Sequence, residues 1–430
     1  MSITKTLYTG VSGLNAHGKA LGVVGDNIAN INTTGYKAER AVFADLLGRS
    51  MTAVDLPGSG VQMSGITRTF SQGTLISTDS PTDLAINGKG FFIVKGNVGG
   101  VDGNFFTRAG EFAMNKDGNL VDPSGNVMQG YRVNSAGDID NQLTDLSVSN
   151  SVLPPSATTA IDVSANLDAT AAALTAPFDE DNAGSTSNFS TAVTVYDSLG
   201  NSHRVDVYFR KETAPPDNTW TWHGVVDGGE IGGTAGDPTE VASGTLSFTS
   251  DGALNSDTVD SAWSATFGGA SAQVIDFDFG ESISDGGTGI SGSTQYASSS
   301  AIRNQDQDGY STGELAGVGV LNNGDVMAIY SNGEQRMVGQ VAIATFEAEG
   351  ELARAGGRLW AETDLSGAAR IGTATAGASG SITSSALEMS TVDLAEEFVN
   401  LIAYQRGFQA NSRTVTTADQ LYQEAVNLKR

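Results

Sequence analysis

Residues 2–37 read SITKTLYTGVSGLNAHGKALGVVGDNIANINTTGYK, and the spacing of their apolar residues decides the fold. Apolar and small residues recur here at alternating spacings of four and three, which places a stripe along one side of a helix. The stripe consists of Leu7, Val11, Leu14, Gly18, Leu21, Gly25 and Ile28. The sequence therefore predicts an N-terminal helix whose stripe needs a partner, and no nearby segment has a helical period.

A matching pattern lies at the other end of the chain, from about Thr391 to Leu428. The same alternation recurs there, and further apolar residues widen the stripe. The candidate contact residues are Leu394, Phe398, Leu401, Ile402, Phe408, Val415 and Leu421. Ser390 and Asp393 precede this helix with the spacing of a capping box. We expect the two terminal helices to pack stripe against stripe, as in a coiled coil.

Glycines weaken the first helix, because each costs up to ~1 kcal/mol relative to alanine. They also allow a neighbouring helix to approach closely. We expect Gly35 to end the helix in a left-handed conformation, with Asn30 and Asn32 as alternative, earlier ends. The following segment AVFADLLGRSM, residues 41–51, is expected to form a short apolar turn.

Between the helices the chain is predicted to be mostly β. It contains 54 glycines, and short segments alternate valine, threonine and phenylalanine with polar residues. Such segments are typical of strands joined by tight turns. We expect turns or hairpins at residues 87–90, 116–119, 122–126, 197–201, 322–325 and 331–334.

A change in composition divides the β region. After Leu153 the chain contains PPSATTA and then an acidic block, since residues 151–290 carry 20 aspartates and glutamates against 3 lysines and arginines. The earlier β pattern returns near Thr294, which indicates an inserted domain. We predict a helical inner domain (1–64 plus 368–430), an antiparallel β middle domain (65–150 plus 294–367) and an inserted β-barrel or sandwich outer domain (151–293).

Composition also excludes several classes of function. A net charge of −26 opposes binding to nucleic acid. The chain has no cysteine, so it forms no disulfide and no thiolate metal site. Its first residues lack the apolar region of a cleaved secretory signal, and no stretch approaches the ~18 apolar residues of a membrane span. We expect export without a cleaved signal and no membrane insertion.

The motifs of catalytic and metal-binding proteins are matched only in part. Residues 13–19 imitate a phosphate-binding loop, but no strand precedes them and the following position is alanine. Residues 304–315 imitate half of a calcium loop, but leucine stands where the bidentate glutamate belongs. The histidines, His17, His203 and His223, have no nucleophile pattern beside them. We expect no enzymatic activity, no catalytic residue, no metal and no cofactor.

Several stretches together resemble the flagellar rod/hook axial protein family of bacteria, and within it the hook proteins. The resemblance rests on residues 72–94 (QGTLISTDSPTDLAINGKGFFIV), 356–367 (GGRLWAETDLSG) and 386–430, and on a motif after the first helix. The motif residues are Asn27, Asn30, Asn32, Thr33, Thr34, Gly35 and Tyr36.

This resemblance implies a structural subunit that the flagellar export apparatus secretes and that polymerises into a flexible tube, a universal joint between rod and filament. Its implied partners are copies of itself and the distal rod, hook cap and hook–filament junction proteins. Two alternatives remain. A distal rod protein of the same family is expected to lack a large inserted domain, and an acidic β-rich adhesin or carbohydrate-binding protein would leave the terminal helices unexplained.

Overall fold

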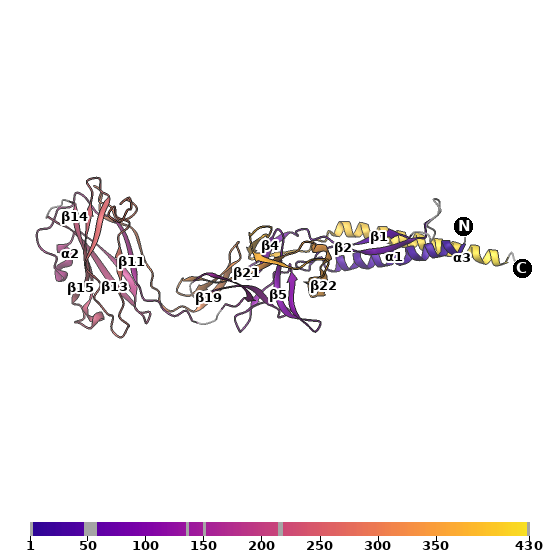
Figure 1. Ribbon diagram of the computed structural model, residues 1–430, viewed down its shortest axis with the longest axis horizontal. Helices are drawn as coiled ribbons and strands as arrows, with labels where there is room; N and C mark the ends of the chain where they lie inside the picture. The colour runs from indigo at the N-terminus through magenta and orange to yellow at the C-terminus, as the bar shows by residue number, and fades with distance from the viewer. Residues whose placement is uncertain (1–2, 47–57, 135–136, 149–151, 214–217, 428–430) are drawn as a thin grey trace. The chain divides into compact units, whose positions relative to one another are not determined.

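The computed structural model describes residues 3–46, 58–134, 137–148, 152–213 and 218–427. Helix α1 (Ile3–Ala29) begins this part of the chain and α3 (Leu394–Asn427) ends it, and nearly all regular structure between them is strand (Figure 1). These residues form two compact units. Unit 1 lies within Met1–Asn150, Gly317–Ile329 and Gln335–Arg430, and unit 2 within Ser151–Ala316 and Tyr330–Glu334. The predicted class, mainly β with helical termini, is confirmed.

In unit 1, α1 and α3 lie side by side and antiparallel (Figure 1). Strands β1 (Glu39–Asp45) and β2 (Val61–Arg68) form an antiparallel hairpin against α1. The ring centroids of His17, Phe43 and Tyr404 lie 5.5 to 6.1 Å apart where the three elements meet. The apolar turn predicted from Ala41 is therefore wrong as far as Asp45, because these residues belong to a strand packed on α1; residues 47–51 lie outside the described part.

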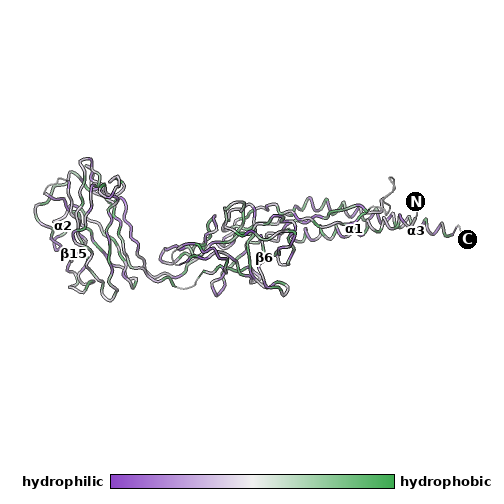
Figure 2. Tube along the Cα trace, in the orientation of Figure 1, coloured by the Kyte–Doolittle hydropathy of each residue, from purple (hydrophilic) through white to green (hydrophobic). Residues whose placement is uncertain are grey.

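The seam between the helices is built from small residues. A methyl group added to Gly13 would lie 2.5 Å from Asn411 Oδ1, and one added to Gly10 would lie 2.8 Å from Val415 Cγ2. On α3, a methyl group at Gly407 would meet the ring of His17 at 2.7 Å. Glycine thus lets the two backbones approach closely. Figure 2 shows hydrophobic and hydrophilic residues interspersed along both helices.

Helix α1 ends at Ala29, next to the earlier alternative end at Asn30, and Gly35 has the expected left-handed conformation with a φ of +69° and lies against the Arg108 backbone. The start of α3 differs from expectation. At the start of α3, Asp393 Oδ1 accepts hydrogen bonds from the amides of Ala395 (2.8 Å) and Glu396 (3.3 Å). The cap is therefore Asp393, and the predicted box that began at Ser390 is wrong by three positions.

The rest of unit 1 is built on a 12-stranded sheet with the path β19-β20-β21-β9-β5-β6-β23-β22. Two separate two-stranded sheets, β3 with β26 and β4 with β25, each pair a strand from early in the chain with a strand from late in the chain. The strands are β3 (Leu75–Ser77), β4 (Leu84–Asn87), β5 (Phe91–Val98), β6 (Val101–Thr107), β7 (Ala113–Met114), β8 (Leu120–Val121), β9 (Val127–Val133), β10 (Ile139–Asp145), β19 (Leu315–Val320), β20 (Asp325–Tyr330), β21 (Gln335–Thr345), β22 (Ala353–Gly356), β23 (Leu359–Ala361), β24 (Arg370–Thr373), β25 (Ser381–Ser384) and β26 (Ala386–Glu388), with a short helix η3 (Glu349–Glu351).

Five of the six predicted turns join strands that pair with each other, including those at residues 116–119, 122–126 and 197–201. The hairpin at residues 87–90 is wrong. The chain does turn there, with φ of +110° at Gly88 and +124° at Gly90. However, β4 pairs with the distant β25 instead of with β5.

A buried ion network links the segments beside the two helices. Glu388 contacts Lys37 Nζ at 2.7 Å through Oε1 and Arg108 Nη1 at 3.3 Å through Oε2. The Gly73 amide donates to the same carboxylate at 2.7 Å. Burial lowers the pKa of Lys37 and of Arg108, and the negative charge of Glu388 opposes both shifts. Glu388 therefore compensates two buried cations at once.

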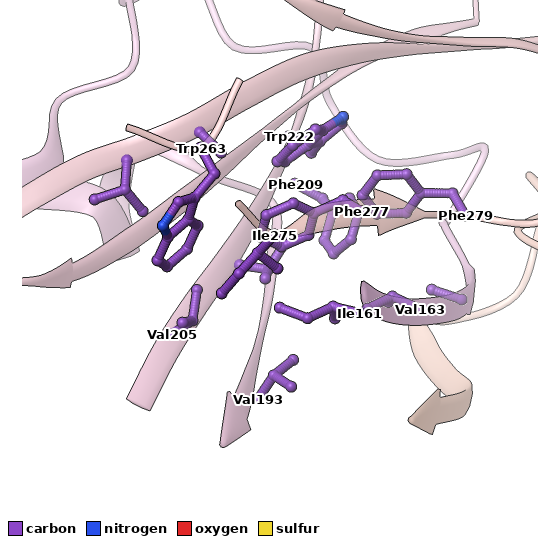
Figure 3. Close-up of a cluster of buried hydrophobic side chains, with 14 of the residues drawn as sticks. Ile161, Val163, Val193, Val205, Phe209, Trp222, Trp263, Ile275, Phe277 and Phe279 are labelled. Carbon is purple, nitrogen blue, oxygen red and sulfur yellow. The ribbon is translucent and has the colours of Figure 1, made fainter. Parts of the chain in front are cut away.

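Unit 2 is a sandwich of a five-stranded sheet, β12-β13-β14-β15-β16, and a three-stranded sheet, β17-β11-β18. Its core joins side chains of both sheets, and Figure 3 shows Trp222, Phe277 and Ile161 within it. Its elements are β11 (Ala160–Asn166), η1 (Glu180–Asn182), α2 (Ala183–Thr186), β12 (Phe189–Tyr196), β13 (Ser202–Lys211), β14 (Thr219–Asp227), η2 (Gly228–Ile231), β15 (Pro238–Phe248), β16 (Leu254–Ser261), β17 (Asp276–Asp278) and β18 (Ala301–Gln307).

Substituting Glu388→Gln should destabilise unit 1 by about 3–5 kcal/mol, because it leaves Lys37 and Arg108 buried without a counter-charge. Calorimetry of the full chain measures this as a lower unfolding temperature of unit 1. The matched control is Glu347→Gln, whose partner Arg370 is exposed; it should change stability by less than about 1 kcal/mol. Equal effects of the two substitutions would contradict this account.

The turn at residues 197–201 gives unit 2 a pH dependence. Burial acts to raise the pKa of the Asp197 carboxyl, but hydrogen bonds from Asn201, His203 and the Leu199 amide outweigh it and lower the pKa to about 2. An unfolded aspartate titrates near ~3.9. The stabilisation is therefore complete above that pH and is lost as the pH falls toward the folded value.

Substituting Asp197→Asn should lower the melting temperature of unit 2 at neutral pH, and the difference from the unsubstituted chain should shrink below about pH 4. Thermal unfolding at a series of pH values measures it. On the same hairpin, Asp206→Asn removes an ion pair with the exposed Arg204 and is the control. A difference that stays constant down to about pH 2 would rule out the linkage.

Candidate functional site

The predicted contact residues lie on the terminal helix pair, and only some of them lie in its seam, where Val415 packs against Gly10. Six of them are 40% to 51% exposed: Val11, Leu394, Phe398, Ile402, Phe408 and Leu421. The others, Leu7, Leu14, Leu21, Ile28, Leu401 and Val415, are half-buried. The predicted stripe-to-stripe seam is thus corrected, because the helices meet through the neighbouring glycine-containing face, where their backbones approach more closely.

We call the side of α3 that points away from α1 its outer face, defined by Phe398, Val399, Ile402, Arg406 and Arg413. These residues are all exposed. Phe398, Ile402 and Arg406 follow one another at intervals of four, so they form one row. The row is apolar toward the start of α3 and basic farther along. Val399, beside it, is 66% exposed.

A cavity of about 510 Å³ lies between α1, the β1–β2 hairpin and the first turns of α3. Glu397 lines it and is only 8% exposed. Glu397 Oε1 accepts a hydrogen bond from Asn27, whereas its Oε2 has no hydrogen-bond partner among the described residues. Burial raises the pKa of Glu397, the Asn27 bond opposes this shift, and Glu396 adds to it.

The side chain of Asn27 joins three elements beside this cavity. Its Nδ2 donates to the Glu39 carbonyl (2.7 Å) and to Glu397 Oε1 (2.9 Å). Its Oδ1 accepts from the Glu39 amide (3.0 Å) and from Tyr36 Oη (3.2 Å). The fully buried carboxamide thereby ties the end of α1 to the start of β1 and to the start of α3.

The other motif residues shape the chain as it leaves α1. Asn30 Nδ2 donates to the Asp26 carbonyl (2.9 Å), and its Oδ1 accepts from Thr33 Oγ1 (3.1 Å). Thr34 Oγ1 donates to Glu111 (2.7 Å). Asn32 is exposed. The motif residues thus fix the path of the chain as it leaves α1. Burial raises the pKa of the Tyr36 hydroxyl, and the negative charges of Asp26 and Glu39 add to the shift.

Sequence reasoning missed Lys37, Arg108, Glu388, Glu397 and Glu39. A signal for Glu397 was present, because it begins a row of small and polar residues spaced by three and four. That row contains Glu397, Asn400, Tyr404, Gly407, Asn411, Val415 and Ala418. For Lys37 and Glu388 no local pattern indicates the pairing, since the two residues lie 351 positions apart.

The segments that partly match phosphate-binding and calcium-binding loops form regular parts of the fold. Residues 13–19 continue α1 without interruption. After β18, the Asp308 carboxylate accepts from the amides of Thr159 (2.7 Å) and Ala160 (3.0 Å). Within the described residues, no group of three or more His, Cys, Asp or Glu is placed to hold a metal ion. Across the same residues, no helix has the length and apolarity to cross a membrane.

Four family models match successive segments of the chain. Residues 7–37 match the flagella basal body rod protein model, and residues 85–165 match the D1 domain of flagellar hook protein FlgE/F/G. Residues 166–310 match the flagellar basal body protein FlaE D2 domain. Residues 383–428 match the C-terminal model of the flagellar basal body rod FlgEFG proteins. Both the terminal helices and the middle block are therefore covered.

Relatives match over nearly the whole length. The flagellar hook protein FlgE of Salmonella typhimurium is 36% identical over 423 residues, which cover 97% of this chain and 98% of that protein. FlgE of Escherichia coli is 34% identical, with 97% and 98% covered, and FlgE of Borreliella burgdorferi is 32% identical, with 99% of each covered.

The crystal structure of Helicobacter pylori flagellar hook protein FlgE2 has a similar fold. It superposes with a TM-score of 0.51 at 16% identity and covers 73% of this chain and 100% of that one. Sequence identity above 30% over almost the full length, rather than this structural likeness, establishes the family. The chain belongs to the flagellar hook protein family.

Proposed function

We propose that this chain is the repeating structural subunit of a flagellar hook, a flexible helical tube that transmits torque from the rod to the filament as a universal joint. The observation that carries this proposal is near full-length similarity to hook proteins, including the middle block that matches the D2 domain model. That block favours a hook protein over a distal rod protein. An adhesin or carbohydrate-binding protein would not account for residues 7–37 and 383–428.

The outer face of α3 supports self-assembly as the mechanism. Phe398, Val399 and Ile402 are each about half exposed or more, so the subunit alone leaves a row of large apolar side chains in water. Covering such a row releases free energy of about 25 cal/mol per Å² of apolar surface. A contact between this face and a different surface of the next copy can repeat from subunit to subunit, and it generates an open helical filament where the rotation between copies does not close a ring.

The three-part division predicted from the sequence assigns a role to each part. The helical part (1–64 plus 368–430) is proposed to make the contacts that drive polymerisation, and the β part (65–150 plus 294–367) to connect it to the inserted domain (151–293). Because residues 294–316, with strand β18, belong to unit 2, the inserted domain extends past the predicted boundary and the connecting β part resumes at Gly317. The acidic surface of the inserted domain favours weak, hydrated contacts that allow bending. The role is structural rather than enzymatic.

The proposed location is the flagellar hook outside the cell, reached through the flagellar export apparatus without a cleaved signal. The proposed partners are copies of this chain, the distal rod at one end, and the hook cap and hook–filament junction proteins at the other. Membership of the hook family supports these proposed partners. Nucleic acid is not a partner, given the net charge of −26.

In a strain whose own hook gene is deleted, this chain should restore the curved segment between rod and filament, as seen by electron microscopy. Phe398→Asp should abolish that segment while the purified subunit stays folded, because the side chain is 51% exposed and its loss leaves the seam intact. The control is Val259→Asp, at a 57% exposed position of unit 2. Normal hooks from Phe398→Asp would refute the proposed contact.

The close approach of α1 and α3 can be tested separately. Gly13→Ala should displace the Asn411 carboxamide from the seam, since the added methyl would lie 2.5 Å from Asn411 Oδ1, and should weaken the packing of the two helices and assembly. Gly22→Ala is the matched control, because nothing lies within 4 Å of its added methyl. It should stabilise α1 by up to ~1 kcal/mol. Circular dichroism compares the two, and equal gains in helicity would contradict the glycine seam.

A further inference from the structure

Glu397 is a buried acid that the subunit does not fully satisfy. Its Oε2 has no partner among the described residues, although it lies in a low-exposure site beside Asn27. A buried carboxylate that lacks a positive partner costs stability. A subunit that retains such a group is stabilised when a positively charged group from another molecule reaches the carboxylate.

The cavity beside Glu397 suits a cation. Its walls carry the acids Glu39, Asp393 and Glu396 in addition to Glu397, against the bases Arg40 and Arg68. Arg68 is already engaged, because its guanidinium lies 3.0 Å from Glu39 and donates to the Leu352 carbonyl. The remaining charge is negative, which favours a basic group. At about 510 Å³, the cavity has room for a long side chain.

Arg406 is a suitable cation on the opposite side of the same helix. It is exposed, and no ion pair is found for it among the described residues. At about 100° per residue, the nine positions between Glu397 and Arg406 place the two side chains on opposite faces, roughly 13 Å apart along the axis. They cannot meet within one copy. A meeting between copies joins two different surfaces, which is the head-to-tail type of contact that propagates.

We propose that the cavity beside Glu397 receives Arg406 from a second copy of this chain, so that an ion pair forms between subunits. Arg406 follows Ile402 by one turn on the outer face of α3, so the ion pair extends the apolar contact already described. This inference rests on the proposed self-assembly. It names Arg406 as the charge partner of Glu397, and it says that the outer face of α3 in one copy meets the cavity of the next copy.

A double-substitution cycle tests the pair in the purified full chain. Glu397→Gln and Arg406→Gln should each raise the critical concentration for assembly by about 10-fold or more. The reason is that close charge pairs at protein interfaces have coupling energies of at least ~1.5 kcal/mol. The double variant should assemble no worse than either single one. Glu347→Gln and Arg370→Gln, which remove the two members of an exposed ion pair of unit 1 away from the cavity and from the outer face of α3, should assemble like the unsubstituted chain.

Two further readouts separate this role from a folding role. Glu397→Gln should raise the melting temperature of the free subunit at neutral pH, because it removes a buried charge whose pKa is raised, even as it weakens assembly. Pairing with a guanidinium favours the ionised acid, so assembly of the unsubstituted chain should improve as the pH rises through the titration of Glu397. That improvement should be absent in Glu397→Gln.

Additive effects of the two substitutions would overturn the pairing, as would normal assembly of Arg406→Gln. A Glu397→Gln subunit that is less stable than the unsubstituted chain would reduce the residue to a structural role and also overturn it. Failure of the unsubstituted chain to assemble would instead overturn the proposed self-assembly, and this inference with it. The experiment thus distinguishes the two failures.

Discussion

The buried carboxamide of Asn27 holds the beginning and the end of this chain together. Its two hydrogen-bond donors and its acceptor oxygen are all used, and one of these bonds reaches Glu397, 370 residues away. The Lys37–Glu388 pair repeats the arrangement over 351 residues. Each contact closes a long loop, and the entropic cost of closure rises only slowly with loop length. A whole domain can therefore be inserted between the ends at little cost in stability.

The same polar contacts fix which faces of the helices meet. Once Asn27 holds Glu397, the row that continues along α3 toward α1 contains Gly407, Asn411 and Val415. The helices then approach closely at Gly10 and Gly13. Phe398, Val399 and Ile402 lie outside this row and stay about half exposed or more. The subunit thus leaves part of its apolar surface for contacts with other copies.

Sequence patterns predicted what depends on local spacing. Both terminal helices, five of six turns and the β character of the middle block follow from periodicity and turn residues near each other in the chain. The largest failures are non-local. Gly88 and Gly90 turn the chain as expected, but Leu84–Asn87 of β4 pairs with the distant Ser381–Ser384 of β25, and spacing alone does not select a distant partner.

The prediction of which helix faces meet was wrong for a related reason. Apolar periodicity identifies a helix face that avoids water, but it does not say whether the same chain or another copy covers that face. In the motif at the end of α1, the resemblance to the family singled out Asn27 and Tyr36. It did not predict the hydrogen bonds that these two side chains form. Glu397 was overlooked because an acid near the start of a helix is ordinarily a favourable partner of the helix dipole on the surface.

Charge sets a condition on any contact between copies of this chain. Each copy carries a net charge of −26, so two copies repel each other at long range, and salt screens that repulsion over about 8 Å at physiological ionic strength. The acid is concentrated in residues 151–290, whereas the outer face of α3 carries Arg406 and Arg413. Association through the helices therefore places apolar and basic groups at the contact and keeps most of the repelling charge elsewhere. Moderate salt favours approach by screening the acidic units, whereas high salt would weaken the proposed ion pair at the cavity. The two electrostatic effects therefore oppose each other. In the proposed contact, burial of Phe398 and Ile402 supplies the part of the association that salt does not weaken.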